Sequence, residues 1–294
     1  MRIRQLGNGG AFHFKQINTS FLISLDNYDD GDVDNGTKLL FDCGRNVVDK
    51  LDELAEKEEF KYSNLKYVYI SHMDDDHIGS LKSLIYYMFF SIGKKIIILS
   101  NPKVAVSLKV YLKDLDGFFE NFNKIDEMLF NFIEVPLNAS IQIDNGVMIS
   151  ALEAKHSIPC AGLKLSSEDG TIYLPGDSME VFINIEARNK PFVVFQDYSL
   201  WDNPGSQVHC CKAKFMKESL SSYFDDYNGI GNVVKSTYRS VKLCHTGLEF
   251  NDQWMTIEEA SNMEDKIMLG LKKDFEAKFE KDKTILLRVA TQSR

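Results

Sequence analysis

The sequence predicts an α/β protein in which β-sheets form the middle layers and helices lie outside. Short β-rich runs alternate with helical runs along the chain, and no long proline- or glycine-rich linker, internal repeat or low-complexity tract separates them. The 294 residues, 44% of them hydrophobic, are enough to bury a sizeable core. We therefore expect an ordinary globular protein of one large domain or two small ones.

The expected elements follow one another in mixed order. The strands are short runs rich in β-branched and aromatic residues, at Arg2–Leu6, Ser20–Leu25, Lys38–Phe41, Tyr67–Ile70, Lys95–Leu99, Val147–Ala154, Gly162–Leu165, Thr171–Leu174, Phe192–Gln196 and Val241–Cys244. The helices are expected at Arg45–Glu58, Ser80–Ser91, Pro102–Val110, Asp114–Met128, Met179–Asn189, Lys212–Tyr223 and Ile257–Lys281.

The charge and hydrophobicity of the chain limit which partners it is expected to bind. The formal net charge of -9 disfavours broad binding of long nucleic acid by a basic surface. No apolar stretch reaches the roughly 18 residues needed to span a bilayer, and the opening MRIRQLGNGG lacks the apolar segment of a signal peptide. We expect a cytoplasmic protein that does not contact a membrane.

The five cysteines predict no disulfide framework and no zinc knuckle. Their number is odd, Cys210 and Cys211 are adjacent and could not pair without strain, and none lies in a CxxC spacing. We expect reduced thiols that serve packing.

The segment SHMDDDHIGS, residues 71–80, is the strongest chemical signal. It places three carboxylates between two histidines, directly after the apolar run YVYI. A loop leaving a strand here can turn His72 with Asp74 toward one ion, and Asp76 with His77 toward a second. Imidazole nitrogen and carboxylate oxygen suit zinc, manganese or iron, and two ions about 3.5–4 Å apart can clamp a phosphoryl group. The segment therefore predicts a dinuclear metal site.

The alternative interpretation is an exposed acidic turn that caps a helix starting near Gly79. It would explain Asp75, and also Asp76 as an N-cap. It leaves both His72 and His77 without a role, so the metal site is favoured.

At this point the chain resembles the metallo-β-lactamase-fold hydrolases. SHMDDDHIGS is similar to their HxHxDH signature, and AKHSIPCAG, YLPGDS and KLCHTG follow in the order of the later ligand motifs. FDCG also matches, and it places Asp42 behind the histidines. The resemblance implies a single domain over residues 1–294 with the αββα sandwich of that fold, two mixed β-sheets flanked by helices.

The resemblance also implies the ligands of two divalent metal ions. The first ion would be held by His72, Asp74 and His156, the second by Asp76, His77 and His245, and Asp177 would bridge them. Zinc is the expected metal. Asp74 departs from the pattern, because most members carry a second histidine there, and the HxDxDH form is similar to that of the hydrolase domains of bacterial DNA-uptake channel proteins. A carboxylate hardens the site, so manganese and iron are alternatives, as is a protein that keeps the fold without metal.

Two further segments resemble the tRNase Z-like and cyclic-nucleotide phosphodiesterase (anti-Pycsar-like) branch. The opening LGNGGAFHFKQINTSFLI is similar to its glycine loop, and VVFQDYSLWDNPGSQVHCCKAKF to its segment with an acid and a later histidine. Asp197 and His209 would be that pair, in which the carboxylate holds an imidazole that protonates a leaving oxygen. A lone surface histidine is the alternative for His209.

The combined resemblance implies a metal-dependent phosphoric diester hydrolase. A hydroxide activated by two metal ions would attack phosphorus, with Asp76 orienting it and His209 protonating the leaving oxygen. The chain lacks the basic arm with which tRNA-processing members grip tRNA, and a helical insertion is expected at 102–135. A cyclic or other small nucleotide is therefore the expected substrate, as in enzymes that erase cyclic-nucleotide defence signals. The alternatives are a tRNase Z-like nuclease, a non-catalytic nucleotide-binding protein, and lactam, lactone or thioester hydrolysis.

Several residues beside the motifs have two possible roles. Residues 7–10 (GNGG) could offer amides to a phosphate or form a simple turn, and His13 could line the cleft or pack within the loop. Aromatic residues near the motifs could stack a nucleobase or lie there by chance, namely Phe12, Phe14, Tyr198, Trp201 and Trp254. The C-terminal run 257–281 predicts a surface or dimer helix, and the resembled branch implies a homodimer.

Overall fold

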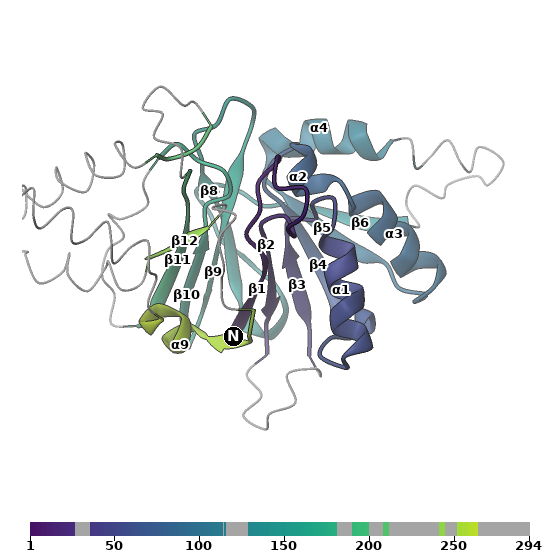
Figure 1. Ribbon diagram of the computed structural model, residues 1–294, viewed down its shortest axis with the longest axis horizontal. Helices are drawn as coiled ribbons and strands as arrows, with labels where there is room; N and C mark the ends of the chain where they lie inside the picture. Colours follow the sequence, from purple (N-terminus) through teal and green to yellow (C-terminus); the bar gives the residue numbers. More distant parts are fainter. Residues whose placement is uncertain are drawn as a thin grey trace, which may run out of the picture.

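Two mixed β-sheets stacked face to face form the centre of the molecule in the computed structural model (Figure 1). The structure describes residues 1–26, 36–113, 115, 129–180, 190–199, 208–211, 241–244 and 252–263. None of the helices in these ranges combines the length and the apolar composition needed to cross a lipid bilayer.

In the described part of the chain, the first sheet contains seven strands. Across the sheet these are β13 (Met255–Thr256), β1 (Arg2–Gly7), β2 (Ser20–Ser24), β3 (Lys38–Phe41), β4 (Leu65–Ile70), β5 (Ile96–Ser100) and β6 (Phe130–Glu134). The pairs from β13 to β3 are antiparallel, whereas β3, β4, β5 and β6 run parallel. The carboxyl ends of the parallel strands therefore meet at one edge of the sheet.

The second sheet contains six strands among the residues that the structure describes. They are β12 (Val241–Cys244), β11 (Phe192–Asp197), β10 (Gly170–Leu174), β9 (Ala161–Ser167), β8 (Met148–Glu153) and β7 (Ile141–Gln142). Strands β7 to β10 are antiparallel, and β10, β11 and β12 are parallel.

Helices cover the outer face of the first sheet (Figure 1). They are α1 (Val47–Glu56), α3 (Leu81–Phe90), α4 (Pro102–Leu112) and the short α2 (Asp75–Ile78). The short helix α9 (Ile257–Asn262) lies instead beside β10 and β11 of the second sheet, and 3-10 turns occur at Tyr62–Asn64 and Asp144–Gly146. Helix α4 begins after Asn101, whose side chain accepts a hydrogen bond from the Lys103 amide. Helix α9 has a capping box between Thr256 and Glu259.

Strand β4 shows why the chain forms this sandwich. Tyr67 and Tyr69 belong to the core between the sheets, while Val68 and Ile70 belong to the core under α1, α3 and α4. A strand buried on both faces reads as a continuous apolar run rather than an alternating one. The rings of Phe21 and Phe195 lie 4.6 Å apart between centroids and join the two sheets.

Two expected helices differ from the structure. The segment 102–135 does not end as a helix, because Phe130–Glu134 form β6, which pairs parallel with β5. Helix α4 (Pro102–Leu112) lies within the expected insertion, and residues 116–128 lie outside the described residues, so the rest of the insertion stays a prediction. The C-terminal helix ends at Asn262, because Met263 is extended (φ -61°, ψ 133°). The Lys242 ammonium donates to the carbonyl oxygens of Ser261 and Met263 there.

Other expected segments cannot be compared. The helices expected at Asp114–Met128, Met179–Asn189 and Lys212–Tyr223, and the run after Met263, fall largely or wholly outside the described residues.

The hydroxyl of Tyr69 ties the two sheets together. It donates a shared hydrogen bond to the carbonyl oxygens of Ala161 (3.0 Å) and Gly162 (2.8 Å) on β9, and all three groups are buried. Burial, and then the nearby Cys160 and Asp42, raise the pKa of Tyr69 well above its ordinary value, so the phenol stays a donor.

We expect Tyr69→Phe to lower the free energy of unfolding by about 1–3 kcal/mol, because it removes the donor of two buried acceptors. Urea denaturation followed by circular dichroism measures this change. The matched control is Tyr87→Phe, since Tyr87 is 39% exposed, and its effect should stay within about 0.5 kcal/mol. Equal stability of the two variants would contradict the role of this hydroxyl.

Candidate metal centre

The candidate site lies where several strand ends converge. Asp42 follows β3, the loop 71–74 follows β4, and α2 comes next along the chain. From the second sheet, His156 lies in the loop between β8 and β9, Asp177 follows β10, and Asp197 ends β11. Segments far apart in the sequence therefore place their polar side chains at one end of the sandwich.

Asp42 is the buried acceptor at the base of the site. Its backbone adopts a positive φ of 60°, a conformation that Asp and Asn tolerate better than most residues. Its carboxylate accepts hydrogen bonds from the Ser71 amide (2.8 Å), the Ser71 hydroxyl (2.7 Å) and Nδ1 of His77 (2.7 Å). Next to it, a Cβ on Gly44 would lie 2.0 Å from the carbonyl oxygen of Asp76, so only glycine permits this close approach.

These bonds fix the orientation of His72 as well as His77. Because the Ser71 hydroxyl donates to Asp42, its oxygen is left to accept from Nδ1 of His72, 2.9 Å away. The Nε2 atom of His72 then carries the lone pair. It lies 3.5 Å from Asp74 Oδ2 and 3.8 Å from Asp177 Oδ2.

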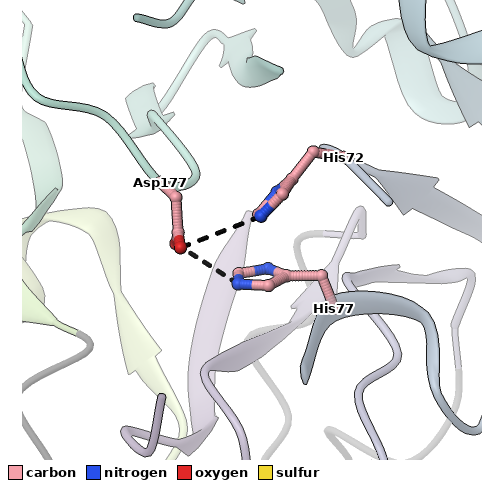
Figure 2. Close-up of side chains that lie close together, drawn as sticks. All are labelled: His72, His77 and Asp177. Atoms are coloured by element: carbon pink, nitrogen blue, oxygen red, sulfur yellow. Dashed lines mark ion pairs between the residues drawn. The ribbon is translucent and has the colours of Figure 1, made fainter. Parts of the chain in front are cut away.

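His77 faces the same carboxylates from α2. Figure 2 shows Asp177 facing both histidines, and Oδ1 of Asp177 lies 3.2 Å from Nε2 of His77. Asp76 Oδ2 lies 3.6 Å from that nitrogen. Burial opposes a charge on His77, but Asp177 and Asp42 together raise its pKa well above its ordinary value. The surroundings thus favour a positive charge, which a proton or a cation could supply.

The donor set fits a divalent cation. Among the described residues, the Nε2 atoms of His72 and His156 are buried without a hydrogen-bond partner, although buried polar atoms usually have one. His156 Nε2 lies 3.9 Å from Asp74 Oδ2. Burial, and then the neighbouring His72, lower the pKa of His156 to about 4, so its imidazole is neutral, the form that binds a metal.

Candidate ligand atoms fall into overlapping groups. Within each group the atoms lie within 4.8 Å of one another, and the groups are His72 with Asp74 and His156, His72 with His77 and Asp177, and Asp177 with Asp197 and His209. The structure thus brings together the expected ligands that it describes. His245 lies outside the described residues, and so does Trp201.

The expected acid pair lies beside this cluster. Nδ1 of His209 is 3.0 Å from Asp197 Oδ2 and 3.6 Å from Asp177 Oδ2. Asp197 is buried and also accepts from the Ser178 amide (2.8 Å). Burial lowers the pKa of His209, but attraction and hydrogen bonding to Asp197, with Asp177, outweigh it and raise the pKa to about 9. His209 is therefore protonated at neutral pH.

Ser71 and Ser178 were missed by the sequence analysis. Ser71 links Asp42 to His72, and Ser178 supports Asp197. Each precedes or follows an expected ligand directly, which is the only signal that could have singled them out.

Asp75 and the cysteines have peripheral roles. The Asp75 side chain is 70% exposed and pairs with Arg45 (3.1 Å). Within the described part of the chain, Cys43, Cys160 and Cys211 are free thiols. Cys160 donates to the carbonyl oxygen of Asp177, and burial raises the pKa of its thiol well above the ordinary value.

Comparison with known protein families shows to which family the chain belongs. The sequence profile of the family described as anti-Pycsar protein Apyc1 matches residues 1–222, most of the chain. The chain belongs to the anti-Pycsar protein Apyc1 family. The Apyc1 protein of Bacillus phage vB_BveM-Goe7 is 33% identical over 105 residues, which cover 36% of this chain and 36% of that protein. The chain thus matches only about a third of the length of this Apyc1 relative.

Solved structures confirm the fold of this Apyc1-family chain. The metallo-β-lactamase fold protein YhfI from Bacillus subtilis has a TM-score of 0.55 at 15% identity, covering 88% of this chain and 91% of that one. The short form of human tRNase Z has a TM-score of 0.57 at 15% identity, covering 87% and 99%. The expected metallo-β-lactamase fold with two mixed sheets is confirmed.

We expect Asp42→Asn to weaken metal binding about 10- to 100-fold. Asn tolerates the positive φ, but an amide NH2 toward His77 would force the proton of that imidazole onto Nε2, where a cation needs a lone pair. Titration of the metal-free protein with Zn²⁺ against a chromophoric chelator measures the affinity.

The matched control for this variant is Asp49→Asn on α1, because Asp49 is exposed. It should bind Zn²⁺ like the original chain. Unchanged affinity in Asp42→Asn, with the control also unchanged, would show that Asp42 does not orient the ligands.

Proposed function

We propose that this chain is a metal-dependent phosphodiesterase that hydrolyses cyclic or other small nucleotides. The observation that carries the proposal is the buried Nε2 atom of His72, which has no hydrogen-bond partner among the described residues and faces the carboxylates of Asp74 and Asp177. Burying an unpartnered nitrogen beside two carboxylates costs free energy unless a cation binds to these groups.

The proposed ligands divide between two ions. His72, Asp74 and His156 would hold the first, Asp76, His77 and His245 the second, and Asp177 would lie between them. Zinc is the metal we expect, with manganese or iron as alternatives because Asp74 replaces an imidazole. When bound, two such cations supply Lewis acidity that activates a water molecule and neutralises charge on phosphoryl oxygens.

The chain's own residues would orient the attacking water and protonate the leaving oxygen. Asp76 would hold its ion and orient the attacking water. Asp197 accepts from Nδ1 of His209 and fixes the ring, so Nε2 can deliver a proton to the leaving oxygen. An alkoxide leaving group needs this proton, and the placement of the pair beside Asp177 supports a phosphodiester substrate.

Family and charge support a small nucleotide. The family description names an anti-Pycsar protein, in line with the resemblance to enzymes that erase cyclic-nucleotide defence signals. The net charge of -9 opposes binding of a long polyanion.

We expect the Zn²⁺- or Mn²⁺-loaded protein to hydrolyse at least one nucleotide in a panel of 3',5'-cyclic nucleotides, and to leave single-stranded RNA and a tRNA precursor intact. Liquid chromatography of the products measures this outcome. Cleavage of RNA alone would favour a nuclease. Tight binding of nucleotides without turnover would favour a non-catalytic binding protein.

We expect His209→Ala to lower turnover about 100- to 10,000-fold without loss of metal, because the variant removes the proton donor but no proposed ligand. Asp197→Asn should act in the same direction, and the double variant should lose little more than His209→Ala, since residues that act as a unit are not additive. Steady-state kinetics and metal analysis by mass spectrometry measure both properties. Loss of metal from His209→Ala would show instead that His209 is a ligand.

A further inference from the structure

Two phenylalanines on the loop between β1 and β2 are highly exposed to solvent. Phe12 is 86% exposed and Phe14 is 73% exposed, more than any other large apolar side chain of the described residues. Single exposed apolar residues are common, but two aromatic rings two positions apart on one loop form a patch with binding potential.

The loop that carries them, residues 8–18, is held in one conformation. His13 Nδ1 accepts from the Gly10 amide (2.9 Å), and the amides of His13 and Gln16 donate to the carbonyl oxygens of Gly10 and His13 (3.0 Å each). Its base is closed by a bond from the Gly9 amide to the Ile17 carbonyl oxygen (3.0 Å). The rings are therefore presented by an ordered backbone, which lowers the entropy cost of binding a ligand.

Arg45 connects this loop to the metal motif. Its guanidinium donates to the carbonyl oxygen of Ala11, lies 5.2 Å from the ring centroid of Phe14, and pairs with Asp75 at 3.1 Å. Asp75 opens α2, directly before Asp76. In Figure 1 the loop between β1 and β2 lies at the same end of the sandwich as α2.

The end of the loop also touches the site. A Cβ on Gly44 would lie 2.6 Å from the Cβ of Asn18 and 2.0 Å from the carbonyl oxygen of Asp76, so Asn18, Gly44 and α2 are in close contact. The Asn18 side chain accepts from the Arg45 amide (3.0 Å). The loop that carries the exposed rings is therefore packed against α2, the helix of Asp76 and His77.

We propose that Phe12 and Phe14, with the guanidinium of Arg45 against Phe14, form a stacking platform for the nucleobase of the substrate. The inference rests on the proposed function. A nucleobase is the occupant that these groups recognise, because aromatic faces and an arginine cation stack on any base without reading its edge. The platform would hold the base while the phosphate lies at the metal centre, and it predicts tolerance toward the identity of the base.

The test compares ligands with and without a base. AMP and ribose 5-phosphate share the sugar and phosphate, and each is titrated as a competitive inhibitor or followed by calorimetry. We expect the double variant Phe12→Ala/Phe14→Ala to bind AMP about tenfold or more weakly, and ribose 5-phosphate as the original chain does. The matched control is Phe90→Ala at the end of α3, since Phe90 is also exposed (58%), and it should change neither affinity.

A second measurement detects AMP binding without any hydrolysis of substrate. In Phe12→Trp, AMP should quench the fluorescence of the new indole, while in Phe90→Trp the added fluorescence should stay unchanged. Quenching in a protein that hydrolyses no diester would refute the proposed function and leave the platform intact.

Three results would overturn the platform. These are unchanged AMP affinity in the double variant, an equal loss for AMP and ribose 5-phosphate, or a fall in oligomeric state by light scattering with AMP binding retained. The last result would show that the rings cover an interface between two copies of the chain.

Discussion

The carboxylate of Asp42 is the constraint on which the rest of the site depends. It accepts from Ser71 twice and from His77, and through the Ser71 hydroxyl it also sets the orientation of His72. One buried acceptor thereby directs two imidazole nitrogens toward the same space. The left-handed backbone of Asp42 and the lack of a side chain at Gly44 bring the strand end close enough for these bonds.

The candidate site also contains an excess of buried negative charge. Asp42, Asp76, Asp177 and Asp197 are all buried at one end of the sandwich, and burial of carboxylates is costly unless positive charge accompanies them. The raised pKa values of His77 and His209 reflect this excess, because the surrounding carboxylates favour positive charge on both imidazoles. Asp74 adds a further carboxylate where an imidazole is usual in the resembled family, which increases the demand for cations and favours harder ones.

Much of this site could be predicted from the sequence because its signals are local. His72, Asp74, Asp76 and His77 lie within one short motif after a strand, and Asp177 and Asp197 each follow a strand of the second sheet. Ser71 and Ser178 could not be predicted, because a serine becomes significant only when folding brings its hydroxyl or amide to a distant carboxylate. The pattern of 102–135 predicts a helical insertion that includes Phe130–Glu134, but these residues form β6, because their pairing with β5 depends on contacts between distant segments that no local pattern shows. The apolar period predicts one helix over 257–281, whereas α9 ends at Asn262, where the Lys242 ammonium donates to the carbonyl oxygens of Ser261 and Met263.

The candidate ligands are divided between the two sheets: the motif after β4 belongs to the first, and His156 and Asp177 belong to the second. An ion held by both sets would act as a cross-link between the halves of the sandwich, at the same end where the Tyr69 hydroxyl reaches β9. Such a cross-link binds the folded chain only, so occupancy would raise the melting temperature in proportion to the logarithm of free metal concentration once the site is saturated. In this architecture the same ions that serve the chemistry would also stabilise the association of the two sheets.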